Sequence, residues 1–180
     1  MNVAIRDTDY ATLTADDTVR IQRLLPGPIE RVWAYLTDSE LRRKWLASGD
    51  MPPQAGMPFE LTWHNDELTD PPGARPEGFE SEHRMQSTIT TFDPPHRLAF
   101  TWNGSASGDV SIELEPRGER VLLTLVHRNL RKREGMVMVG AGWHMHLDIL
   151  AARMAGEEPA PFWDGWSRLR RDYDQRIPTA

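Results

Sequence analysis

The stretch that decides the fold runs from residue 134 to residue 156 and reads EGMVMVGAGWHMHLDILAARMAG. Apolar side chains recur in it at steps of three and four, at Trp143, Leu147, Leu150 and Met154. Because an α-helix turns once every 3.6 residues, this spacing places the four side chains in one stripe. The stretch therefore predicts a long helix with one apolar side, which must lie against another element.

The composition bounds the class of protein. The chain has 180 residues, of which 39% are hydrophobic and 27% charged, as is typical of one soluble globular domain. A net charge of −6 argues against nucleic-acid binding, which needs a basic face. No apolar run is long enough to span a membrane. The absence of cysteine excludes disulfides and thiolate metal sites, and it favours a cytoplasmic location.

The segments before the long helix indicate strands and two short helices. Residues 18–25 alternate as a strand does, and Pro26-Gly27-Pro28 ends it. Residues 29–36 and 40–46 carry apolar residues at helical spacing, and in the second of these short helices Leu41 and Trp45 are expected to face inward. From residue 57 to residue 127 the period is two, interrupted by turns rich in proline and glycine, and one long strand is expected over residues 79–92.

These elements predict an α+β fold in which a curved antiparallel sheet of about six to seven strands wraps around the long helix. We expect residues 1–15 to form a loose N-terminal tail and residues 16–156 to form a single domain. Residues 157–180 are expected to add a C-terminal helix packed on that domain. A curved sheet that grips one helix leaves a gap at one end, and a gap of this kind is where a ligand would bind.

Three segments, in this order, carry a resemblance to a known family: PGPIERVWAYLTDSELRRKWL at 26–46, FDPPHRLAFTW at 92–102 and GWHMHLDILAARMAG at 142–156. The chain resembles the START-like superfamily, also called SRPBCC. Within it, the chain is similar to the branch homologous to the activator of the heat-shock protein 90 ATPase. The resemblance implies the helix-grip fold. It leaves the function open, because this superfamily hosts lipid carriers, hormone receptors, cyclases and co-chaperones on one scaffold.

Eight aromatic, apolar or titratable side chains are candidates for lining a cavity between the sheet and the long helix. Tryptophan is common in pockets because it is large and amphipathic, and a histidine in an apolar cavity can bond a ligand's polar end. The candidates are Trp33, Trp45, Trp63, His83, Met85, Trp102, His127 and Trp143. We expect no metal and no cofactor, since the chain has no helical metal motif, no phosphate-binding glycine loop and no nucleophile elbow.

The histidines of the long helix lie on different sides of it. His144 and Asp148 are four residues apart and share a face, and we expect them to form a pair at the surface. His146 points elsewhere and is expected to bond a neighbour at the sheet edge. Gly140 and Gly142 each cost a helix about 1 kcal/mol, so they indicate close packing or a bend where the helix meets the cavity.

Three functions remain open at this point. The first is the binding of a small hydrophobic or aromatic ligand in the internal cavity. The second is a co-chaperone-like interaction module, with a chaperone or a second copy of the chain as partner. The third is a cyclase- or hydratase-like enzyme, in which His83 or His127 transfers a proton inside the cavity.

Overall fold

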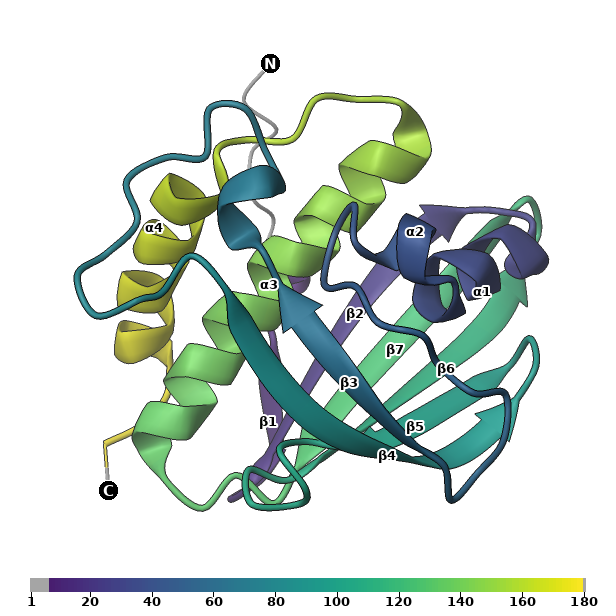
Figure 1. The fold of residues 1–180 in the computed structure, drawn as a ribbon. Helices are drawn as coiled ribbons and strands as arrows, with labels where there is room; N and C mark the ends of the chain where they lie inside the picture. The colour runs from purple at the N-terminus through teal and green to yellow at the C-terminus, as the bar shows by residue number, and fades with distance from the viewer. Residues whose placement is uncertain (1–6, 180) are drawn as a thin grey trace.

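The computed structural model describes residues 7–179, and its largest element is a seven-stranded antiparallel sheet (Figure 1). The strand order is β1-β2-β7-β6-β5-β4-β3. The strands are β1 (Thr12–Ala15), β2 (Thr18–Pro26), β3 (Pro58–Trp63), β4 (His83–Asp93), β5 (Arg97–Thr101), β6 (Asp109–Arg117) and β7 (Arg120–Arg128). The helices are α1 (Ile29–Thr37), α2 (Ser39–Arg42), α3 (Arg133–Ala155) and α4 (Phe162–Arg176), with 3₁₀ turns η1 (Asp7–Asp9) and η2 (Asn65–Glu67). This order confirms the predicted α+β class and helix-grip architecture.

Alternating side chains give the sheet one apolar face. In β2, Val19, Ile21 and Leu25 are buried, whereas Arg20 and Leu24 are exposed. β2 pairs with β7 in antiparallel register, so the inward residues of the two strands lie side by side. Successive side chains of a strand point to opposite faces, and the inward ones together form the surface that the long helix covers.

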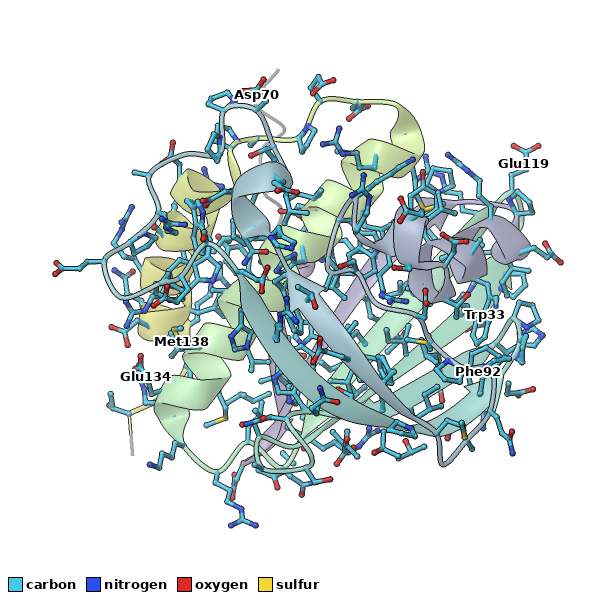
Figure 2. The ribbon with its side chains drawn as sticks, in the orientation of Figure 1. Trp33, Asp70, Phe92, Glu119, Glu134 and Met138 are labelled. Carbon is cyan, nitrogen blue, oxygen red and sulfur yellow. The ribbon has the colours of Figure 1, made fainter. Side chains whose placement is uncertain are left out.

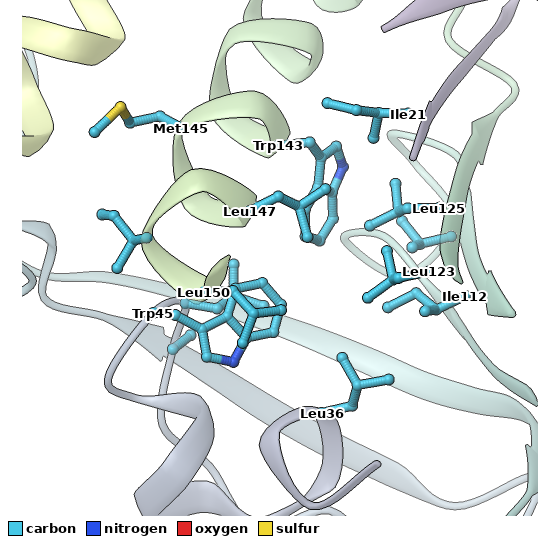
Figure 3. Packing of buried hydrophobic residues seen from close by; sticks show 14 of the residues in the cluster. Ile21, Leu36, Trp45, Ile112, Leu123, Leu125, Trp143, Met145, Leu147 and Leu150 are labelled. Carbon is cyan, nitrogen blue, oxygen red and sulfur yellow. The ribbon is translucent and has the colours of Figure 1, made fainter. Parts of the chain in front are cut away.

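α3 lies across the concave face of the sheet and is buried on two sides (Figure 1). Trp143 and Leu147 point toward Ile21 and Leu125 of the sheet, whereas Met145 points away from the sheet (Figure 3). Burying a leucine completely stabilises a fold by about 1.5–3 kcal/mol. The predicted single stripe therefore understates the buried surface of α3, because a second side of the helix is covered by α4.

α4 packs against α3 through two glycines. A Cβ atom at Gly140 of α3 would lie 3.0 Å from Tyr173 of α4, and one at Gly165 of α4 would meet the side chain of Met145. The two helices approach closely because neither glycine has a side chain. This contact accounts for the close packing that the sequence indicates at Gly140.

The N-terminal segment differs from the loose tail expected over residues 1–15. Residues 12–15 form the edge strand β1, which pairs with β2. The hydroxyl of Tyr10 donates to Asp172 at 2.7 Å, and the backbone N–H of Ala11 donates to the hydroxyl of Tyr173 at 2.6 Å. Residues 7–15 are therefore held by β2 and α4, through polar contacts that no apolar periodicity reveals. Residues 1–6 lie outside the described residues.

Two further boundaries differ from the sequence-based expectation. The strand expected from residue 79 begins at His83, because residues 64–82 form a loop that contacts α4. The second short helix ends at Arg42 and not at residue 46. No helix among residues 7–179 has the length and apolar character needed to cross a membrane.

Candidate functional site

A cavity of about 370 Å³ lies where α3 meets the ends of β3, β4 and β5, and we call it the tryptophan cavity. The loop of residues 64–82 and the first turn of α4 form its outer walls. Its lining residues are Leu46, Trp63, Asn65, Gly78, Phe79, Glu80, His83, Trp102, Met138, Val139, Gly142, Trp143, His146 and Trp163. Gly78, Glu80 and His83 are exposed, so this part of the lining faces solvent.

The aromatic rings of the cavity contact one another. The ring centroids of Trp63 and Trp102 are 5.7 Å apart, and those of Trp102 and Trp143 are 5.2 Å apart. Phe79 and Trp163 are 5.4 Å apart on the opposite wall. Such tilted and edge-on pairs add to the stability that burial alone provides, so they hold the walls in place.

Four of the eight candidate residues line this cavity: Trp63, His83, Trp102 and Trp143. Pairing of β3 with β4 places Trp63 directly opposite His83, with ring centroids 5.5 Å apart. Trp102 directly follows β5, and Trp143 lies in the middle of α3. The fold therefore brings four of the predicted residues together at one cavity, and each comes from a different part of the chain.

The other four candidates lie elsewhere. Met85 and Trp45 are buried in the core, and the indole N–H of Trp45 donates to the carbonyl oxygen of Tyr35 at 2.8 Å. Trp33 packs edge-on against Phe92, far across the molecule from Met138, which lines the cavity (Figure 2). The helix α1 that carries Trp33 covers a different end of the sheet from the one at which the cavity forms (Figure 1).

His127, the fourth of these, is buried one layer behind the cavity. Its Nδ1 accepts a hydrogen bond from the indole N–H of Trp143 at 3.2 Å, and its Nε2 donates to the carbonyl oxygen of Ser107 at 2.9 Å. Burial lowers the pKa of His127, so the ring is neutral at neutral pH. Because both nitrogens are engaged, His127 positions Trp143 and has no free nitrogen for a ligand.

His146 lines the cavity although the sequence pattern did not select it. Its Nδ1 lies 2.8 Å from the carbonyl oxygen of Trp45, and burial lowers its pKa to about 4. It follows Trp143 by three residues and Gly142 by four, which places all three on adjoining parts of one helix face. That spacing was the signal that could have identified it. Trp163, at the start of α4, had no comparable local signal.

His144 is buried, and the expected surface position is wrong. The side chain is fully covered by Tyr10 and Tyr173, whose hydroxyl lies 2.9 Å from His144 Nδ1. Its Nε2 faces a carboxylate oxygen of Asp148 at 3.4 Å, so the predicted pairing is present. Burial is the main cause that lowers the pKa of His144 to about 3, and the nearby Arg23 contributes to the same shift. The N-terminal segment and α4 cover this side of α3, which the helix pattern alone does not reveal.

Two other features bear on the site. Among residues 7–179, no group of three or more histidines, cysteines or acidic residues is arranged to hold a metal ion. A second hollow of about 450 Å³ lies beside Gly27–Glu30 and the hairpin between β6 and β7. Its lining contains no aromatic ring and no histidine, in contrast to the tryptophan cavity.

Comparison with solved structures finds the same fold in proteins from several bacteria. The protein encoded by BPP1335 of Bordetella parapertussis is 40% identical, with a TM-score of 0.78 over 95% of this chain and 92% of that one. CalU16 from Micromonospora echinospora is 20% identical, with a TM-score of 0.64 over 90% and 89% of the two chains. EF2215 from Enterococcus faecalis, a conserved protein of unknown function, is 15% identical, with a TM-score of 0.63 over 91% and 86%. At these lower identities the likeness shows the fold.

The family comparison is more specific. No curated protein matches the chain. The family model described as Activator of Hsp90 ATPase homolog 1-like protein matches residues 26–155, from the end of β2 to the end of α3. This range includes the three segments that carry the resemblance in the sequence, except for Gly156, the last residue of the third. The chain therefore belongs to the family of Activator of Hsp90 ATPase homolog 1-like proteins.

Proposed function

We propose that the chain binds a small hydrophobic or aromatic ligand in the tryptophan cavity. The observation that carries this proposal is the convergence of Trp63, Trp102, Trp143 and Trp163 on one hollow from four different elements. Ligand pockets are typically lined by apolar and aromatic side chains with a few polar groups, and their volumes run from about 300 to 1,000 Å³. The cavity volume of about 370 Å³ suits a ligand of two fused rings or similar size.

The route to the cavity also supports binding. Gly78 and Glu80 come from the loop of residues 64–82, and both are exposed at the cavity. A molecule can therefore enter from solvent on this side without displacing the sheet. The core residues beneath, such as Met85 and Trp45, remain packed.

Gly142 offers a direct test. It lines the cavity, and a Cβ atom there would meet no other atom within 4 Å. We expect Gly142→Leu to fill the cavity without strain in the fold and to abolish binding of β-naphthol, measured by titration calorimetry and proton–nitrogen correlation NMR. Gly135→Leu is the matched control, since Gly135 lies in the same helix, has equal free space and does not line the cavity.

Binding to the wild type and to Gly135→Leu, with chemical-shift changes centred on Trp63, Trp102 and Trp143, would support the proposal. The proposal fails if β-naphthol does not bind the wild type, or if Gly142→Leu binds it as well as the wild type does.

The other two functions have weaker support. A co-chaperone-like role rests on family membership alone, and its test is whether the protein changes the ATPase rate of a heat-shock protein 90 chaperone. A cyclase- or hydratase-like reaction needs a free proton-transfer group in the cavity. The bonding of His127 removes one of its two candidates and leaves His83.

A further inference from the structure

His146 presents a hydrogen-bond acceptor to the tryptophan cavity. Its Nδ1 lies 2.8 Å from the carbonyl oxygen of Trp45, and a carbonyl oxygen can only accept. The hydrogen of the neutral ring must therefore be on Nδ1, which leaves the lone pair on Nε2. Among residues 7–179, no hydrogen bond uses Nε2 of His146, and this atom is not among the fully buried atoms without a partner. Nε2 is therefore accessible from the cavity that the ring lines.

The ring keeps this form at neutral pH. Burial lowers the pKa of His146 to about 4, even though the bond to Trp45 favours the charged form. A neutral imidazole with Nδ1–H fixed has one free acceptor and no free donor. His146 therefore complements an O–H or N–H group and not a carbonyl or carboxylate oxygen.

Asn65 also lines the cavity, from η2, but its Oδ1 is fully buried, so a molecule in the cavity does not contact this atom unless the side chain rearranges.

The charges around the cavity restrict the ligand further. The lining contains no lysine and no arginine, and its one acidic residue is the exposed Glu80. A carboxylate ligand would meet no cation and would face Glu80. An ammonium ligand would have to give up its contacts with water and lie beside the neutral ring of His146. Removing an unpaired charge from water in this way costs free energy.

We infer that the tryptophan cavity selects an uncharged aromatic ligand with a hydroxyl group, and that His146 Nε2 accepts the hydroxyl hydrogen. This inference rests on the proposed function and names the ligand class of that site. His146 is then the residue that determines specificity, while the tryptophans contribute most of the affinity.

Three probes of similar shape test the inference on the wild-type protein. They are β-naphthol, which donates a hydrogen bond; its methyl ether, which cannot donate; and β-naphthoate, which is an anion. We expect β-naphthol to bind about five- to tenfold more tightly than the ether, the value of one net hydrogen bond. β-Naphthoate should bind most weakly. The nitrogen chemical shift of His146 Nε2 should move on addition of β-naphthol and not on addition of the ether.

Two variants locate the acceptor. His146→Phe keeps a ring of similar shape and should reduce the preference for β-naphthol over the ether to about onefold. His83→Phe is the matched control, because His83 also lines the cavity but is exposed at its mouth. It should retain the preference. If His146→Phe does not fold, the comparison of probes and the Nε2 shift in the wild type still decide the question.

The outcomes separate the two proposals. Equal affinity for β-naphthol and the ether, both lost in Gly142→Leu, overturns the inference and supports the proposed function. Loss of the preference in His83→Phe alone assigns the acceptor to His83 and also overturns the inference. Failure of all three probes to bind contradicts the proposed function and the inference together.

Discussion

Each of the three buried histidines, His127, His144 and His146, is neutral at neutral pH and contacts a polar neighbour through at least one ring nitrogen. Trp143 donates to His127, the hydroxyl of Tyr173 contacts His144, and the carbonyl of Trp45 accepts from His146. Burial lowers the pKa of all three rings. Their chemical difference comes from the remaining nitrogen, which is engaged by Ser107 in His127, faces Asp148 in His144 and has no hydrogen-bond partner within residues 7–179 in His146.

These lowered pKa values predict that the free energy of unfolding decreases as the pH is reduced below about 6.5, the ordinary pKa of histidine. The folded-state pKa is lowered to about 3 for His144 and to about 4 for His146. Between those values and 6.5 the unfolded chain takes up protons that the folded protein does not, so acid favours unfolding. Each histidine contributes at most about 1.4 kcal/mol per pH unit. Above pH 7 this contribution is constant.

Urea unfolding at pH 5 and pH 7 checks this. His144→Gln should flatten the pH dependence by up to about 1.4 kcal/mol per pH unit, because one acid-sensitive group is lost. His96→Gln, at an exposed position, serves as the control and should keep the wild-type slope. An unchanged slope in His144→Gln would exclude His144 as a source of the acid sensitivity.

Single residues were the hardest to predict from the sequence. The pattern favoured Leu41 as inward-facing, but it is half-buried, while the adjacent Arg42 is 2% exposed. The guanidinium of Arg42 donates to backbone carbonyls between residues 36 and 49, and burial lowers its pKa to about 10. Hydropathy places an arginine at the surface because it cannot anticipate a ring of carbonyl acceptors. His146 was missed for a related reason, since its partner Trp45 lies 101 positions away.

At the scale of elements, the contact between α3 and α4 depends on the absence of side chains. We expect Gly140→Ala to destabilise the protein by about 1–3 kcal/mol, although alanine favours helix more than glycine does. The new Cβ atom would lie 3.0 Å from the ring of Tyr173, which is itself fixed by Ala11 and His144. Thermal and denaturant unfolding measure the effect.

Gly135→Ala is the matched control for this prediction. Gly135 lies in the same helix, and a Cβ atom there would meet no other atom within 4 Å. It should stabilise the protein by up to about 1 kcal/mol through helix propensity. A Gly140→Ala variant as stable as Gly135→Ala would mean that α4 moves freely on α3.

Elements with a strong period were predicted well. The long helix was expected within 134–156 and runs over Arg133–Ala155, and the strands after residue 97 follow their alternating apolar residues. Elements whose bounds depend on polar contacts with distant parts of the chain were predicted less well. The strand expected from residue 79 starts at His83 because the preceding loop is bonded to α4, where the backbone N–H of Phe162 donates to Thr69.

For the molecule as a whole, α4 joins segments that are far apart in sequence. It contacts the N-terminal segment through Tyr10, covers α3, and forms one wall of the cavity with Trp163. The family model ends at residue 155, before α4, whereas the 40% identical Bordetella protein aligns over 95% of the chain. The resemblance seen in the sequence therefore covered the sheet and α3 but not α4, the helix that completes the cavity.

Trp163 should control the loop of residues 64–82. Its indole N–H donates to Asp66 at 2.7 Å, and its backbone N–H donates to the carbonyl of Pro72. Trp163→Phe removes the side-chain bond and keeps the backbone bond, and we expect amide hydrogen exchange in this loop to accelerate about five- to tenfold. Trp166→Phe is the control, because Trp166 also packs on Phe79 in the same helix. Equal acceleration in both variants would assign the effect to lost aromatic packing and not to the Asp66 bond.

The close contacts among Trp63, Trp102 and Trp143 also have an optical consequence. Indoles whose ring centroids lie 5.2 and 5.7 Å apart share their electronic excitations. The cavity therefore contributes a coupled band to the circular dichroism spectrum, apart from the signal of the backbone. A ligand that moves the rings apart would change that band while the helix and sheet signals stay constant. Circular dichroism would therefore detect binding in the cavity without a label.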